Sequence, residues 1–102
     1  MKLETTSMQI KYTKSASNSL TNLIYFIEKT NTLDSGIRWL NKYELFLKSA
    51  LMLSINPKIC NNLSLKELGL NCLYYNEWLI AYSIQQDFIL IEAIFHKSRI
   101  VD

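Results

Sequence analysis

The sequence has few of the residues that most often build a metal or redox centre. Its 102 residues include one histidine and two cysteines. Cys60 and Cys72 lack the spacing of zinc ligands, so we expect no metal and no cofactor. We expect both cysteines to be reduced, partly buried thiols, as is usual in a cytosolic protein. Only two glycines and one proline occur, and the hydrophobic content of 49% excludes a disordered chain.

Excess charge and long apolar runs are also missing. The formal net charge is +2, and the 11 lysines and arginines are spread along the chain, so charge alone does not indicate a nucleic-acid partner. No apolar run reaches membrane-spanning length and the N-terminus lacks a signal core, which predicts a cytoplasmic protein with no membrane partner. The length predicts a single domain, residues 8–102, after a flexible polar tail at residues 1–7.

Residues 88–97 alternate between two sets of side chains, as a β-strand does. Ile91 and Phe95 belong to the set that has no polar member. Glu92 and His96 belong to the other set. We therefore expect Ile91 and Phe95 to face the core, and Glu92 and His96 to face the other way.

Two further strands complete the last third of the chain. Residues 78–84 alternate as well, and the short polar segment 85–87 predicts a hairpin turn after them. Residues 70–75 make a plausible third strand. The sequence thus predicts a three-stranded antiparallel meander. The segment 64–69 before it is either a short helical turn or the start of a strand.

The first half of the chain is predicted to form a short strand and a helical layer that covers the sheet. Residues 8–13 alternate as a short strand, and residues 15–29 and 34–53 show helical spacing of apolar residues. We expect an α+β fold in which an N-terminal strand precedes an antiparallel two-helix hairpin, packed on one face of a small antiparallel sheet that ends in the meander. The hairpin residues expected in the core are Leu23, Ile27, Ile37 and Leu40.

The second helix carries an aromatic stripe beside its aliphatic one. Trp39, Tyr43 and Phe46 recur at helical spacing. Two stripes are more than one sheet contact requires. Most of the aromatic stripe is expected to pack inside the molecule, and an exposed remainder would bind a partner.

Several stretches resemble the RelE/ParE family of bacterial toxins, which belong to type II toxin–antitoxin modules. Ile10–Ala16 resembles the family's opening strand and helix start, and Leu53–Pro57 resembles the end of its second helix. Lys66–Leu68 resembles a strand entry. Tyr82–Ile84 and Phe88–Arg99 resemble the closing hairpin, and Ile94–Arg99, at its end, is the most specific match. The sequence departs from the family at Leu79 and Ser83, where members commonly carry arginine. Alternation places both on the face opposite Ile80 and Tyr82, which carries function in the family.

The resemblance implies a growth-inhibiting toxin with a cognate antitoxin as partner. RelE-type members are ribosome-dependent messenger-RNA endonucleases, whose reaction needs an acid–base group and cations. The expected catalytic residues are His96, Arg99, Glu92 and Lys97, and the residues expected to bind RNA or another target are Lys66, Glu67, Tyr75 and Ser83. The residues expected to bind the antitoxin are Trp39, Tyr43, Phe46, Leu79 and Leu90. If the protein cleaves RNA, Leu79→Arg should raise its activity.

Two alternatives to RNA cleavage remain open. ParE-type members of the family act on DNA gyrase without known catalysis, and the missing arginine at Leu79 fits such a member. A degenerate toxin that still binds antitoxin but is inactive is the other alternative. A cation-rich cleft would favour RNA, whereas a mostly neutral face with exposed Trp78, Tyr74 or Tyr75 would favour protein binding.

Overall fold

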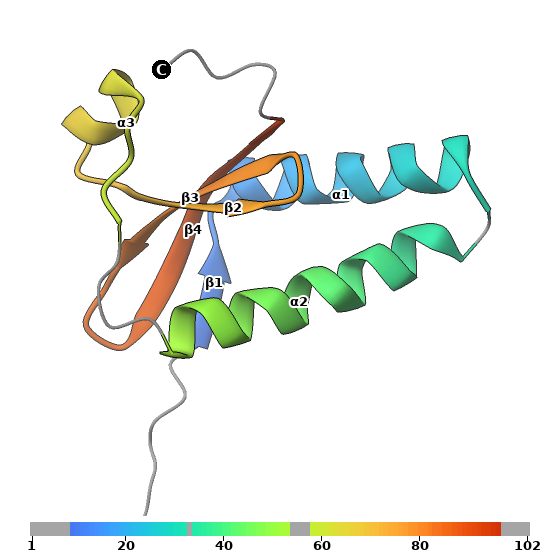
Figure 1. Cartoon of the computed structure of the whole chain (residues 1–102), viewed down its shortest axis with the longest axis horizontal. Coiled ribbons are helices and arrows are strands. Elements are labelled where there is room, and N and C mark those ends of the chain that lie inside the picture. The colour runs from blue at the N-terminus through green and yellow to red at the C-terminus, as the bar shows by residue number, and fades with distance from the viewer. Residues whose placement is uncertain (1–8, 33, 54–57, 97–102) are drawn as a thin grey trace, which may run out of the picture.

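The computed structural model describes residues 9–32, 34–53 and 58–96 (Figure 1). The elements follow in the order β1 (Gln9–Tyr12), α1 (Lys14–Thr30), α2 (Ser35–Leu53), α3 (Leu63–Glu67), β2 (Asn71–Tyr75), β3 (Trp78–Ile84) and β4 (Phe88–His96). This order confirms the predicted α+β fold, with its opening strand, two helices and closing meander. The short helix α3 begins one residue before the uncertain segment 64–69 and covers its first part. No helix within the described ranges is long and apolar enough to cross a membrane.

The four strands form one mixed sheet in the order β1-β4-β3-β2. The meander β2-β3-β4 is antiparallel as predicted, whereas β1 pairs parallel with β4. The expectation of a wholly antiparallel sheet is therefore wrong at its first strand. A parallel pair needs a long connection, and the helices and strands between β1 and β4 supply it.

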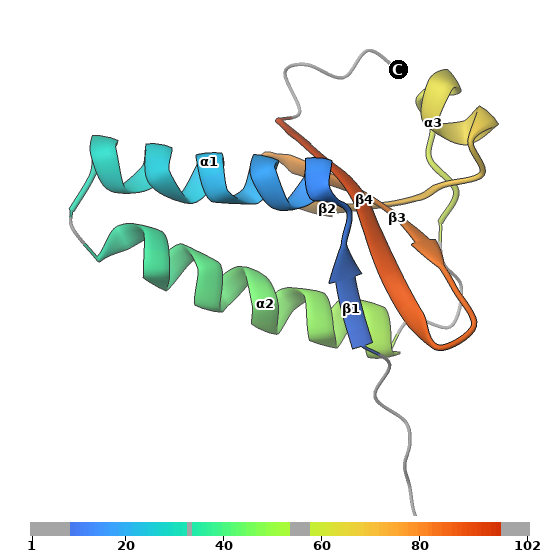
Figure 2. The same cartoon turned by 180° about the vertical axis from the view of Figure 1, so that it is seen from behind.

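Helices α1 and α2 form the predicted antiparallel hairpin and lie side by side along one face of the sheet (Figures 1 and 2). Gly36 lets them approach closely, because a Cβ atom there would lie 2.5 Å from the Glu28 side chain and 2.9 Å from that of Ile24. Leu23 is buried as expected. Ile37 is 54% exposed, so its predicted place in the core is wrong.

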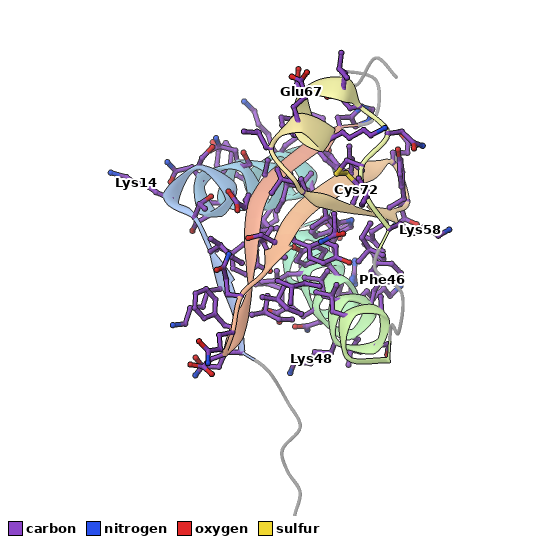
Figure 3. All side chains as sticks on the ribbon, turned by 90° about the vertical axis from the view of Figure 1, so that its left-hand side faces the viewer. Lys14, Phe46, Lys48, Lys58, Glu67 and Cys72 are labelled. Atoms are coloured by element: carbon purple, nitrogen blue, oxygen red, sulfur yellow. A yellow bond between two sulfur atoms is a disulfide. The ribbon has the colours of Figure 1, made fainter. Side chains whose placement is uncertain are left out.

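The two faces of the sheet are covered differently. On the helix-covered face, side chains from α1, α2, β3 and β4 form the larger cluster of buried residues, namely Ala16, Tyr43, Leu47, Leu51, Ile80, Tyr82, Ile89, Ile91 and Ile94. Residues 58–70, here called the cap, cover the other face. There the buried residues are Cys60, Leu65, Leu70, Leu79 and Ala81. Figure 3 shows the cap, with Glu67 labelled, above the strands and the end of α2 with Phe46 and Lys48 below them.

A disulfide joins Cys60 of the cap to Cys72 of β2 (Figure 3). The prediction of two reduced thiols is therefore wrong. The cap folds back along the outer edge of β2, where Ile59 bridges Asn71 and the Cys72 N–H donates to the Lys58 carbonyl at 2.9 Å. This return of the chain brings the two cysteines together, with their Cα atoms 4.8 Å apart.

Strand β4 contains a β-bulge. Ala81 pairs with Ala93, but the next residue of β3, Tyr82, pairs with Ile91. Glu92 is therefore an extra residue between two regular stretches of the ladder. A bulge of this kind places two residues of one strand opposite one residue of its partner, so the side-chain alternation shifts there.

The bulge overturns the predicted faces of β4. Ile91 is buried on the helix-covered face, as expected. Beyond the bulge, Ile94 also lies on the helix-covered face, whereas Phe95 packs against the cap cluster. His96 follows Ile94 onto the side of the helices, where it contacts Trp78. The predictions that Phe95 shares a face with Ile91, and that His96 lies opposite it, are both wrong.

Thr13 stabilises the bulge from the far end of the chain. Its N–H donates to the Ile91 carbonyl at 3.0 Å, and its hydroxyl donates to the Glu92 carbonyl at 3.1 Å. The same hydroxyl oxygen accepts the Ala16 N–H at 3.1 Å and so caps α1. One threonine thus fixes both the start of α1 and the irregular ladder of β4.

Candidate functional site

An open groove of about 360 Å³ lies between the helical hairpin and the turn that joins β2 to β3. We call it the His96 groove. Its lining comes from α1, the end of that helix, α2, the β2–β3 turn and the adjoining ends of β3 and β4. The lining residues are Leu23, Phe26, Ile27, Asn31, Trp39, Asn76, Glu77, Trp78 and His96.

The β2–β3 turn sets the polar rim of the groove. Asn76 has a positive φ of 54°, a conformation that asparagine tolerates better than most residues and that suits a two-residue hairpin turn. The turn places Glu77 within 3.1 Å of His96, measured from Oε1 to Nε2. The His96 ring also meets Trp78 edge-on, with ring centroids 4.9 Å apart. His96 therefore sits between a carboxylate and an indole.

Charged side chains are few in the part of the groove that the structure describes. Its described lining contains one carboxylate and one imidazole but neither lysine nor arginine. A phosphorane-like transition state carries negative charge, which needs cations or other donors to stabilise it. Lys97 and Arg99, the expected cations, lie outside the described residues.

Glu92 lies apart from His96. Its carboxylate accepts a hydrogen bond of 2.8 Å from the Ser83 hydroxyl, which in turn accepts one of 2.9 Å from the Gln85 side chain. Ser83 alternates with Leu79 and Ala81 on the cap-covered side of the sheet. The structure therefore places Glu92 and His96 on opposite faces, and the idea that they share a strand face is wrong.

The expected target-binding residues are dispersed. Lys66 and Glu67 are exposed on α3, within the cap and across the sheet from the His96 groove. Neither of these two residues, which were expected to bind the target, lines the described part of the groove. Tyr75 is half-buried on the helix side, where its ring centroid lies 4.8 Å from that of Phe46 and 5.7 Å from that of Trp39.

Most of the aromatic stripe of α2 packs inside the molecule, as expected. Tyr43 is 1% exposed and stacks on Trp39 at 5.2 Å. Its hydroxyl shares a hydrogen bond of 3.1 Å with that of Tyr12. Burial, and then this hydrogen bond, raise the pKa of Tyr43 above its ordinary value. Trp39 and Phe46 are half-buried, and only Trp39 of the three lines the groove.

Leu79 does not lie on an open functional face. It is 1% exposed beneath the cap, in the cluster with Cys60 and Leu65. An arginine at this position would be forced into an apolar interior. The prediction that Leu79→Arg completes a catalytic cleft therefore has no structural basis. Leu90 is half-buried and pairs with Ser83 on the same side of the sheet.

Sequence reasoning missed Glu77 as a neighbour of His96. The strands expected at residues 70–75 and 78–84 leave Asn76 and Glu77 between them, but the place of Glu77 beside His96 depends on the pairing of Trp78 with His96 across the β3–β4 hairpin. That pairing follows from the bulge at Glu92. A β3–β4 hairpin without the bulge would keep the register set at the 85–87 turn, and Trp78 would then pair with Phe95 instead of His96.

The fold of this chain is similar to that of a solved structure. No protein-family model and no curated protein matches the amino-acid sequence. Among solved structures, the chain is similar to one from "Chromosomal ParDE TA system from P. aeruginosa", with a TM-score of 0.69 and 11% sequence identity. The match covers 90% of this chain and 98% of that chain. The protein therefore has a RelE/ParE-like fold, as its sequence resemblance predicted.

Proposed function

We propose that this protein is the growth-inhibiting toxin of a type II toxin–antitoxin module, and that it acts by binding its target without cleaving RNA. The likeness in fold to a chain from a ParDE system supports the general assignment. The absence of lysine and arginine from the described lining of the His96 groove is the observation that carries the choice of mechanism. The separation of Glu92 from His96 supports the same choice.

The proposal includes two partners. A cognate antitoxin would neutralise the protein, as the family resemblance implies. DNA gyrase is the first target to test, because ParE-type members act on it without known catalysis. A cytoplasmic location belongs to this proposal, since that is where both partners would be met.

The test is controlled expression in bacterial cells, followed by assays of a cell extract. Messenger-RNA integrity and gyrase supercoiling are measured in parallel on the same extract. We expect growth to stop, supercoiling to fall and messenger RNA to remain intact. Leu79→Arg, which we expect to be strongly destabilised, serves as the control with reduced activity.

Two results would contradict the proposal in different ways. Ribosome-dependent cleavage of messenger RNA would establish the RelE-like mechanism instead. Normal growth at high expression of the folded protein would indicate a degenerate member of the fold.

A further inference from the structure

We propose that the His96 groove binds a cationic side chain, arginine or lysine, that an apolar segment of a partner protein presents. The inference deepens the proposed function, because it assigns a contact surface and a chemistry to a protein partner. It concerns the groove alone and not the target of the toxin.

The floor of the groove is apolar and rich in aromatic rings. Phe26 is 60% exposed, so its ring is accessible to a partner. Trp39 and Trp78 are half-buried and face the same space from α2 and from β3. Rings of this kind offer apolar contact area, and their faces attract cations.

The charge at the rim decides what such a floor can hold. Glu77 contributes a carboxylate whose side chain is 69% exposed, beside a histidine that is charged only when protonated. The remaining described polar side-chain groups of the lining are uncharged, namely the amides of Asn31 and Asn76 and the indole N–H groups of Trp39 and Trp78. A carboxylate above aromatic rings attracts an ammonium or guanidinium group and repels a phosphate. This complementarity favours a basic protein segment over a nucleic acid.

The shape of the groove fits a segment better than a small molecule. Its sides are the helical hairpin and the β2–β3 turn, which lie together in both views of the cartoon (Figures 1 and 2). A volume of about 360 Å³ lies at the small end of ligand sites, and the groove is open to solvent. One cation and one or two flanking apolar side chains fill such a space. The cation would take the place of His96 at the Glu77 carboxylate.

The test uses two synthetic peptides. The first is acetyl-Leu-Ser-Leu-Arg-Leu-Ser-Leu-amide, and the second carries uncharged citrulline in place of arginine. The chain has two tryptophans, and both line the groove, so their indole N–H signals in NMR spectra report binding directly. We expect the arginine peptide to shift both signals saturably, and the citrulline peptide to bind at least tenfold more weakly.

Matched variants then locate the charge effect. Glu77→Gln should reduce the affinity for the arginine peptide to that for the citrulline peptide. Asp87→Asn removes an exposed carboxylate from the turn at the opposite end of the β3–β4 hairpin, and should leave the affinity unchanged. Circular dichroism and thermal unfolding confirm that each variant remains folded.

Several results would overturn the inference. Equal binding of the two peptides, or equal weakening by Asp87→Asn, would remove the role of charge at Glu77. Failure of both peptides to bind at millimolar concentration would show that the groove is not a docking site for such a segment. Binding only after deletion of residues 97–102 would indicate that the chain's own C-terminal segment is the occupant. None of these measurements involves growth inhibition, so their failure leaves the proposed function standing.

Discussion

The helix-covered and cap-covered faces of the sheet are stabilised in different ways. The first is covered by two long helices, and its buried cluster draws side chains from both helices and both central strands. The second is covered by a short irregular segment with a single five-residue helix. There the covalent Cys60–Cys72 link fastens the cover to the edge of the sheet. The comparison teaches that apolar area secures one face, whereas a small core and a cross-link secure the other.

The largest expected change in unfolding free energy tests whether the cap covers its face of the sheet. Leu79→Arg should cost about 4 kcal/mol of unfolding free energy or more, because it buries an unpaired charge. Ser83→Arg is the matched control on the same strand and side, since Ser83 is only half-buried and the new cation lies beside Glu92. It should cost less than about 1 kcal/mol. Urea unfolding measures both, and similar losses would mean that the cap does not cover Leu79.

The second effect concerns the cross-link of the cap. Reduction by a dithiol should lower the unfolding free energy by about 3 kcal/mol, the loss expected for a loop of this length. Hydrogen exchange should show the loss of protection in the cap before the helix-covered strands. Free-thiol titration is the control, and two reactive thiols in the untreated folded protein would contradict the disulfide.

The third effect concerns the junction of β1, α1 and β4 on the other side of the molecule. Thr13→Val keeps the shape of the side chain but removes the helix cap and the hydrogen bond to the Glu92 carbonyl. It should cost about 1–2 kcal/mol. Thr21→Val, at an exposed position within α1, is the control and should change stability by less than about 0.5 kcal/mol. Equal losses of stability in the two variants would show that Thr13 does not stabilise the bulge.

The smallest stability effect appears only at high pH and belongs to the helix-covered face. The raised pKa of Tyr43 means that the folded state holds its proton more tightly than the unfolded state. The associated stability is fully present below pH 10 and is lost as the pH rises above it, by about 1.4 kcal/mol at pH 11. Tyr43→Phe should reduce this alkaline loss in unfolding curves recorded at pH 8 and pH 11. An unchanged pH dependence would contradict the coupling.

The comparison of the two faces also shows what the sequence could predict. Strand β3 has no extra residue, so alternation placed Ile80 and Tyr82 on one face and Leu79 on the other, as observed. Strand β4 could be assigned only as far as Ile91. The bulge after it depends on Thr13, which lies 79 residues away from Glu92 in the sequence.

The neighbours of the candidate site residues could not be predicted for the same reason. His96 was selected from the sequence, but its neighbour Glu77 depends on the register beyond the bulge. The cover over Leu79 depends on the return of the cap along β2, which local patterns do not specify. Local periodicity therefore predicted the elements, whereas contacts between distant segments determined which residues share a site.

The measurement that tests the account most directly is growth inhibition by His96→Ala. Expression of this variant and of the parent at matched levels is followed by growth curves and by messenger-RNA integrity. If the protein acts without cleaving RNA, messenger RNA remains intact while the parent stops growth, and it remains equally intact when His96→Ala is expressed. Loss of growth inhibition in the folded variant, together with loss of messenger cleavage that the parent shows, would contradict the account and establish His96 as catalytic.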